Sequence, residues 1–388
     1  MRRTPLAATL VLAALAAASR ASSAENIGVT AAPVLQVPLG SRALGMGTAF
    51  TAVASDSSGL SYNPAGLARL NAHEAGLTYI AGAGESVIQH LAYAGPTPLS
   101  GISGSGYTSI GASLLFSQSG TIEINRLRSD GSLQSSQSLP AGNDLVASFG
   151  YAERVGMTPL ELREASYGID HFIGLGGKFI RSTLVQSYSA SPFAGDVGYL
   201  AGSREAGWSF GASALNLGGR LKYIEQADPL PSTLRSGIAW QTGVRSIHHV
   251  VAALDGDYVL DEKVWHVNAG LEYFWLKSYG FRLGYQFHRG DAVGLTTGFG
   301  LRWKGRILFD YAWALGDSFG NAHRVTLTYR FAGVPPSVRG RQRRPFIEAA
   351  PERERMRGLE EKKPAESDIP RPRAVPRDRS QGVPGWIY

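Results

Sequence analysis

The sequence predicts an all-β fold: a transmembrane antiparallel β-barrel of about 14 strands. Three observations support this prediction. Apolar and polar residues alternate along most of residues 74–331. The alternating stretches are about 9–11 residues long, which is the length of a tilted strand that crosses a bilayer. Aromatic residues gather toward the ends of these stretches, as they do at the two membrane interfaces of a barrel.

The alternation alone is compatible with two folds. In a soluble sandwich the apolar face would form the core and the polar face would meet water. In a membrane barrel the apolar face meets lipid and the polar face lines the lumen. We favour the barrel because the polar faces carry full charges and many glycines, and a sandwich would not bury charges unpaired. The expected lumen-facing polar residues are Arg235, Glu272, Arg282, Gln286 and Arg324. They could brace the barrel by pairing with one another or with a segment inside the lumen, or they could contact a ligand or partner.

Turn residues divide the alternating region into strands. We expect strands to begin near residues 74, 86, 107, 143, 171, 193, 206, 232, 247, 264, 279, 294, 305 and 322. Weaker candidates near 120 and 183 could form a hairpin outside the membrane. Residues 126–143 and 154–170 are expected to be outer loops, and the acidic cluster Asp255, Asp257 and Asp261 is expected in a solvated loop.

The two ends of the chain differ from the middle. Residues 1–24 have the features of a signal peptide: Arg2 and Arg3, an apolar run over residues 6–18, and small residues before a cleavage site after about Ala24. Residues 25–73 precede the first clear strand and include the glycine-rich stretch of residues 40–70. Residues 332–388 are rich in proline and arginine, so we expect a disordered periplasmic tail. These features predict export to the bacterial outer membrane, where lipid is the first partner.

Composition excludes several classes of function. The net charge is +7, but residues 1–24 carry +3 and residues 333–388 carry +5, which leaves −1 for residues 25–332. A nearly neutral body argues against nucleic-acid binding. There is no cysteine, the eight histidines lack the spacing of a metal site, and no serine-hydrolase motif occurs. We therefore expect no enzyme activity, no catalytic residues, no metal and no cofactor.

The glycine-rich stretch of residues 40–70 carries a resemblance to a known family. Its Leu-Gly-Met-Gly at 44–47, Asp56 and Asn-Pro-Ala-Gly at 63–66 match in order and spacing the N-terminal signature of the PorV/PorQ family, among the FadL-like outer-membrane barrels. A second match is the Asn-x-Gly at 216–218, followed by the Leu-Pro-x-x-x-Arg-x-Gly at 230–237. The resemblance covers most of residues 35–331. The tail departs from it, because such barrels usually end at the aromatic residue of the last strand.

The resemblance implies that residues 25–73 form an N-terminal hatch inside the barrel lumen, and it implies two alternative functions. Its hatch residues would be Gly45, Gly47, Asp56, Asn63, Pro64 and Gly66. A PorV-like protein would act without catalysis in protein secretion or surface delivery, with secretion-system or envelope proteins as partners. A FadL-like protein would instead be a channel for the uptake of hydrophobic small molecules such as fatty acids. The sequence favours the first alternative through the Leu-Pro-x-x-x-Arg-x-Gly match and leaves the second open.

Overall fold

The structure is a computed structural model that describes residues 29–82, 86–162, 165–185, 188–223, 225–242, 246–287, 294–315 and 321–333. The expected signal peptide, and the expected tail from residue 334 onward, lie outside the described residues. The rest is almost entirely β-structure, with only short helices near the N-terminus.

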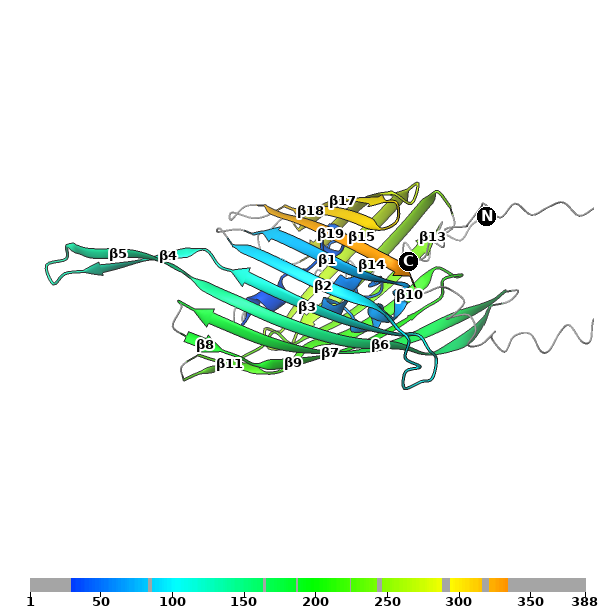
Figure 1. Cartoon of the computed structure of the whole chain (residues 1–388), viewed down its shortest axis with the longest axis horizontal. Coiled ribbons are helices and arrows are strands. Elements are labelled where there is room, and N and C mark those ends of the chain that lie inside the picture. Colours follow the sequence, from blue (N-terminus) through cyan, green and yellow to red (C-terminus); the bar gives the residue numbers. More distant parts are fainter. Residues whose placement is uncertain are drawn as a thin grey trace, which may run out of the picture. The chain divides into compact units, whose positions relative to one another are not determined.

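Fourteen strands form a closed antiparallel barrel, because each strand pairs with its neighbours and the last strand, β19, pairs with the first, β1 (Figure 1). This confirms the predicted fold class and strand number. The barrel strands are β1 (Ala72–Ala81), β2 (Val87–Thr97), β3 (Thr108–Gln118), β6 (Gly142–Leu162), β7 (Ala165–Leu184), β9 (Phe193–Gly202), β10 (Trp208–Gly218), β13 (Thr233–Thr242), β14 (His248–Val259), β15 (Val264–Trp275), β16 (Tyr279–Phe287), β17 (Leu295–Trp303), β18 (Ile307–Ala314) and β19 (Ala322–Gly333).

Five shorter strands lie outside this ring. They are β4 (Thr121–Leu127), β5 (Leu133–Pro140), β8 (Tyr188–Ala190), β11 (Arg220–Lys222) and β12 (Ala227–Pro229). Strands β4 and β5 pair only with each other and project from one end of the barrel as a ribbon (Figure 1). We call this end distal, and the end where β1 begins and β19 ends proximal.

The prediction that residues 126–143 and 154–170 are both outer loops is wrong. These two segments lie at opposite ends of the barrel, because a single strand crossing separates them. Residues 154–170 are not a loop but the paired ends of β6 and β7. These ends extend past the proximal edge, since β3 begins opposite Glu153 and β9 ends opposite Asp170 (Figure 1).

The alternation seen in the sequence separates the two faces of the wall. On β3, for example, Ile110, Leu114 and Phe116 are exposed on the outside, whereas Ser113 and Leu115 are buried on the inside. The outer surface is therefore rich in apolar and aromatic side chains. No helix in the described part of the chain is long and apolar enough to cross a membrane.

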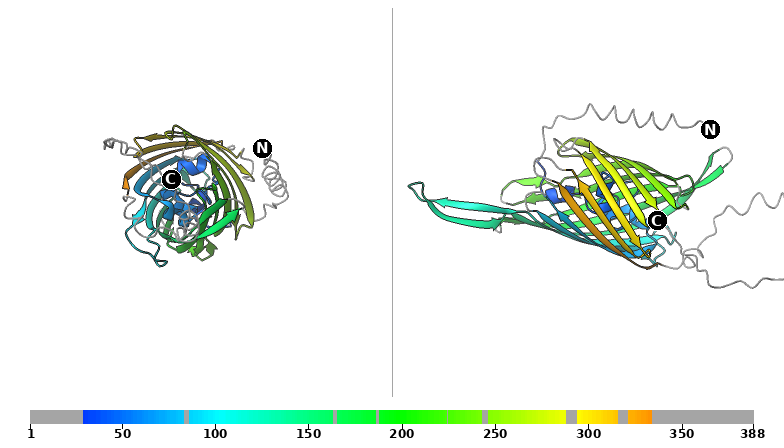
Figure 2. Two further views of the ribbon diagram at one scale, coloured as in Figure 1. Left: turned by 90° about the vertical axis from the view of Figure 1, so that its right-hand side faces the viewer. Right: turned by 90° about the horizontal axis from the view of Figure 1, so that it is seen from above.

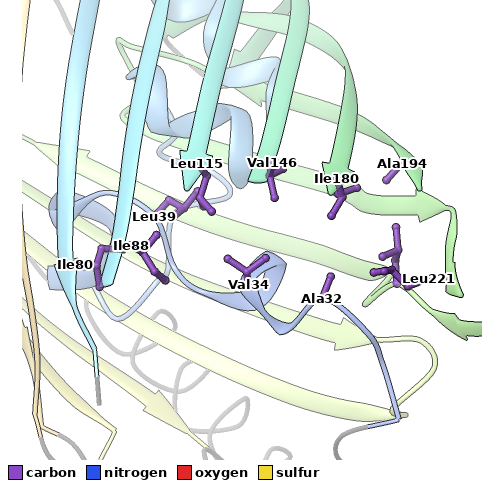
Figure 3. Close-up of a cluster of buried hydrophobic side chains, with 11 residues drawn as sticks. Ala32, Val34, Leu39, Ile80, Ile88, Leu115, Val146, Ile180, Ala194 and Leu221 are labelled. Atoms are coloured by element: carbon purple, nitrogen blue, oxygen red, sulfur yellow. The ribbon is translucent and has the colours of Figure 1, made fainter. Parts of the chain in front are cut away.

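The N-terminal segment, residues 29–70, lies inside the barrel (Figure 2). It holds four short helices: η1 (Pro33–Gln36), α2 (Ser41–Gly45), η2 (Ser57–Ser61) and η3 (Pro64–Arg69). Near the distal end, Val34 and Leu39 pack against Ile80, Ile88 and Leu115 of the wall (Figure 3). At the proximal end the segment leads into β1. The hydrophobic core of the protein therefore lies inside the barrel, between the N-terminal segment and the wall.

Candidate functional site

The candidate site is the lumen, where the N-terminal segment meets the inner wall. Glycines of the wall allow the backbone of the segment to come unusually close. A Cβ atom on Gly284 of β16 would collide with the backbone of Met46 and Gly47, and one on Gly174 of β7 would collide with Pro64 and Ala65. These neighbours are backbone atoms, so a change of rotamer cannot make room. These glycines on the inner face of the wall therefore form the surface against which the backbone of the segment packs.

Two buried carboxylates hold the segment by its backbone. Asp255 Oδ2 accepts hydrogen bonds from the backbone N–H groups of Phe50 and Thr51, at 2.8 and 2.7 Å. Glu74 Oε1 accepts one from the backbone N–H of Ser57 at 2.6 Å. Hydrogen bonds to charged acceptors are stronger than neutral ones, and these are shielded from water. The wall carboxylates therefore fix the middle of the segment.

A buried ion-pair network adds a side-chain attachment. Arg42 donates to both oxygens of Glu272, at 2.9 and 2.8 Å, and Glu272 also accepts from Arg282 at 2.8 Å. Arg282 lies 2.7 Å from a carboxylate oxygen of Asp310, and Arg42 lies 3.2 Å from Asp56. The network links α2 to three wall strands, so it couples the position of the segment to the packing of the wall.

The six predicted hatch residues all lie in the N-terminal segment. Gly47 has a φ of +63°, and a Cβ there would lie 2.7 Å from the carbonyl oxygen of Ala269, so only glycine fits. Gly45 and Gly66 are buried, Gly45 against Arg282 and Gly66 against Ala54. Asp56 and Asn63 cap the next two helices, and Pro64 is the first residue of η3.

Asn63 joins the segment to itself and to the wall. Its Nδ2 donates to the carbonyl oxygens of Thr51 and Tyr199, at 3.0 and 2.9 Å, while its Oδ1 accepts from the backbone N–H of Ala65 at 3.1 Å. The side chain is fully buried. The Asn-Pro-Ala-Gly stretch is thus attached to β9 through the hydrogen bond from Asn63 to Tyr199.

All five predicted lumen-facing polar residues lie on the inner wall. Besides Glu272 and Arg282, described above, Arg235 donates to the carbonyl oxygen of Thr48 at 2.9 Å and lies 3.1 Å from Asp257. Gln286 donates to Thr48 Oγ1 at 3.2 Å, and Arg324 is buried on β19. Arg235, Glu272 and Gln286 thus contact the segment directly, whereas Arg282 pairs with Glu272 and Asp310 of the wall, and Arg235 and Gln286 also line the cavity described below.

The placement of the acidic cluster near residue 255 in a solvated loop is wrong for two of its members. Asp255 and Asp257 are buried on the inner face of β14, where they pair with Arg235. Sequence reasoning also missed Arg42 and Lys178. Lys178 pairs with Asp196 at 3.0 Å and donates to Asn216 at 2.6 Å. The alternation over residues 249–259 places Asp255 and Asp257 on the same face as the apolar residues Val251 and Val259, and this pattern indicates that both aspartates point inward.

A cavity of about 170 Å³ lies beside the segment, toward the distal half of the lumen. The first part of the segment and the wall supply its apolar lining, and charged or amide side chains line the remainder. The apolar residues include Val34, Leu35, Pro38, Leu39, Leu115, Val146, Leu215 and Val259. The polar residues include Lys178, Asn216, Arg235, Asp257, Asn268 and Gln286. The cavity can hold a small molecule with an apolar body. In the described part of the chain, no cluster of acidic and histidine residues is arranged to hold a metal ion.

Comparison with known proteins gives the following likenesses. The profile of an uncharacterised protein family (UPF0164) matches residues 8–131. No curated protein matches the chain. Among solved structures, the Pseudomonas putida toluene transporter TodX is similar at 13% identity and a TM-score of 0.46, over 80% of this chain and 100% of that one.

Two further solved structures are similar to the chain. A Pseudomonas aeruginosa FadL homologue has 11% identity and a TM-score of 0.41, over 76% of this chain and 99% of that one. The Acinetobacter baumannii outer membrane protein Omp33 has 3% identity and a TM-score of 0.40, over 68% of this chain and 100% of that one. With TM-scores below 0.5, these likenesses carry no argument about function. The chain's own coordinates establish a closed 14-stranded barrel whose lumen holds its N-terminal segment.

Proposed function

We propose that the protein is an outer-membrane channel that takes up small hydrophobic molecules, with the lumenal cavity as the binding site on their path. The observation that carries the proposal is the cavity itself, which is lined in part by apolar side chains of both the segment and the wall and in part by charged and amide side chains. An apolar cavity of about 150 Å³ binds benzene in another protein. A cavity of about 170 Å³ therefore suits a molecule of about one aromatic ring.

The outer surface supports placement in a membrane. Leu77, Leu91, Leu114, Leu271 and Leu283 are each about half exposed on successive parts of the wall. Aromatic residues flank them toward both ends, among them Trp265 distally and Trp303 proximally. A soluble monomer rarely exposes an apolar surface of this extent, whereas lipid-facing barrels require one.

Entry from the distal end follows from how the segment is attached. Its first part is held by the hydrogen bond from Ala31 N–H to the carbonyl oxygen of Pro229 and by bonds from Thr30 and Gln36 to Glu262. Its middle is held by the ion pairs and wall carboxylates described above. The first part forms one side of the cavity, so a molecule that enters from the distal end reaches the cavity if this part moves while the middle stays attached.

The resemblance to secretion proteins implies a different role, which stays a prediction. It requires protein partners and surface cargo, and the lumenal cavity does not call for either. Deleting the gene and comparing the surface proteins tests this alternative directly: loss of particular surface proteins would favour it over uptake. The absence of catalysis also stays a prediction.

Filling the cavity tests the proposed channel. Leu115 is buried and lines the cavity, whereas its neighbour Leu114 is about half exposed on the outer face. We expect Leu115→Trp to reduce toluene uptake by cells to the level of cells without the protein, because the larger side chain occupies the binding site. Leu114→Trp, which adds the same side chain facing lipid, should leave uptake unchanged.

The readout is the initial rate of labelled toluene uptake at matched amounts of folded barrel, which are judged by mobility on unheated gels. Equal uptake by the two tryptophan variants and the original protein would show that the cavity is not on the path. Equal loss in both variants would point to damage of the wall and not to blockage of a site.

A further inference from the structure

The proximal rim carries three cations in adjacent tight turns. Lys277 lies in the turn between β15 and β16, and Lys304 and Arg306 lie between β17 and β18. The turns are neighbours, because the backbone N–H of Arg302 donates to the carbonyl oxygen of Ser278 at 2.7 Å. Lys304 and Arg306 are exposed and Lys277 is half-buried. The three positive charges therefore lie close together on one part of the proximal rim, where they are accessible from outside the barrel.

The backbone of these turns is unusual for lysine. Lys277 has a φ of 57° and Lys304 a φ of 48°, in the left-handed region that tight hairpin turns normally fill with asparagine or glycine. A bulkier residue adopts this conformation less readily. Lysines in two neighbouring turns thus occupy positions where the backbone alone would favour another residue.

Aromatic side chains border the cations on the outer face. Trp275, Tyr279 and Trp303 are 45%, 38% and 57% exposed, and Lys304 Nζ lies 5.1 Å from the centre of a Trp303 ring. Within the described ranges, none of Lys277, Lys304 and Arg306 forms an ion pair. We call these three cations, with Trp275, Tyr279 and Trp303, the proximal belt.

We propose that the proximal belt binds the anionic headgroups of phospholipids in the leaflet at the proximal end. The inference rests on the membrane placement proposed above, and it does not depend on what passes through the lumen. Exposed tryptophan and tyrosine lie at the level of lipid headgroups. Cations beside them therefore face phosphate groups, and an anionic leaflet attracts such basic residues.

The distal end differs in charge. There Lys263, which also has a positive φ, follows Asp261 and Glu262 directly in the turn between β14 and β15. In the β4–β5 ribbon, Asp130 lies two residues from Arg128. Mixed signs give little net attraction to an anionic surface. The two belt turns, by contrast, contain no acidic residue beside their cations, so we assign the anionic phospholipid to the proximal side.

Lipid binding by the purified full-length protein tests the belt. We would count bound lipids by native mass spectrometry in mixtures of phosphatidylglycerol and phosphatidylcholine with the same acyl chains. The original protein should prefer phosphatidylglycerol. The variant Lys277→Gln/Lys304→Gln/Arg306→Gln should lose this preference, by about fivefold for each charge removed. Raising the salt concentration should weaken the preference of the original protein and have no such effect on this variant.

Two control variants keep the test specific. Arg220→Gln/Lys222→Gln/Lys263→Gln removes three cations from the distal end and should keep the preference. Lys277→Arg/Lys304→Arg/Arg306→Lys keeps the charges and should also keep it, which separates charge from turn folding. Each variant is first checked for a folded band on unheated gels.

The remaining outcomes overturn the inference. A preference that is absent from the original protein, or lost equally in the distal variant, would show that the belt does not select lipid. The first of these results would also fit a rim that binds an acidic protein. Failure to insert into vesicles of either lipid would instead overturn the membrane placement. Insertion into both without a preference overturns only the belt.

Discussion

Glu272→Ala is expected to lower the free energy of unfolding by about 3–5 kcal/mol, the cost of breaking a buried ion pair by removing one partner. Glu272 is fully buried and accepts hydrogen bonds from both Arg42 and Arg282. Without it, Arg282 keeps Asp310 and Arg42 keeps Asp56, but both lose their shared acceptor. The positive charges of the two buried guanidinium groups are then incompletely compensated.

The measurement is urea unfolding of the protein in lipid vesicles, followed by tryptophan fluorescence. Asp170→Ala is the matched control, because it breaks the Arg154–Asp170 pair, whose side chains are 22% and 28% exposed. This pair is more open to water than the fully buried network, so its loss should lower the stability by less than the loss of Glu272 does. If the two variants lost the same stability, the lumenal network would not hold the barrel together.

A double-mutant cycle separates the contribution of the segment from that of the wall. Arg42 belongs to α2, whereas Glu272 and Arg282 belong to neighbouring strands. If the Arg42–Glu272 contact fastens the segment, Arg42→Ala and Glu272→Ala should be strongly non-additive. Additive losses would mean that Glu272 acts through Arg282 alone.

Strand alternation predicted the barrel well, because it reports directly which face of the wall a residue occupies. The start at residue 264 and the inward placement of Glu272 and Arg282 both followed from it. The same alternation runs through β14, but three aspartates close together are also typical of a solvated loop, and the sequence alone favours the loop. Buried Asp255 is possible only because Arg235 and two backbone N–H groups face it.

The contacts of the N-terminal segment could not be predicted in the same way. Arg42 meets Glu272 across 230 residues, and nothing local to either residue specifies that pairing. The close approach of the segment to the wall also depends on glycines of distant strands. Gly284 of β16, for example, leaves the room that the backbone of Gly47 occupies. The composition indicated that a small, turning segment was present. Its place in the lumen depends on tertiary packing.

Gly284→Ala is expected to displace the N-terminal segment and to raise the ion conductance of the barrel. The added methyl group would fall on backbone atoms of Met46 and Gly47, which no side-chain rearrangement can move aside. Forcing one extra carbon into a packed site typically costs about 1–3 kcal/mol. The segment must therefore shift or partly detach, since the hydrogen-bonded wall is the stiffer partner.

Conductance across planar bilayers measures the opening, with Gly256→Ala as the control. Gly256 lies on β14, and a Cβ there would meet nothing within 4 Å. Both variants add one methyl group to a wall glycine, so general effects on strand formation are matched. Equal conductance in the two variants and the original protein would mean that the segment does not close the lumen at β16.

Limited proteolysis decides whether raised conductance comes from the segment or from a loosened wall. Arg42 is 12% exposed and held by Glu272, so trypsin should not cut after it in the original protein. A displaced segment exposes this bond while the barrel stays folded. We therefore expect Gly284→Ala to yield a fragment that begins at Ala43 from protein that still runs as a folded band. Higher conductance without this cleavage would locate the opening in the wall.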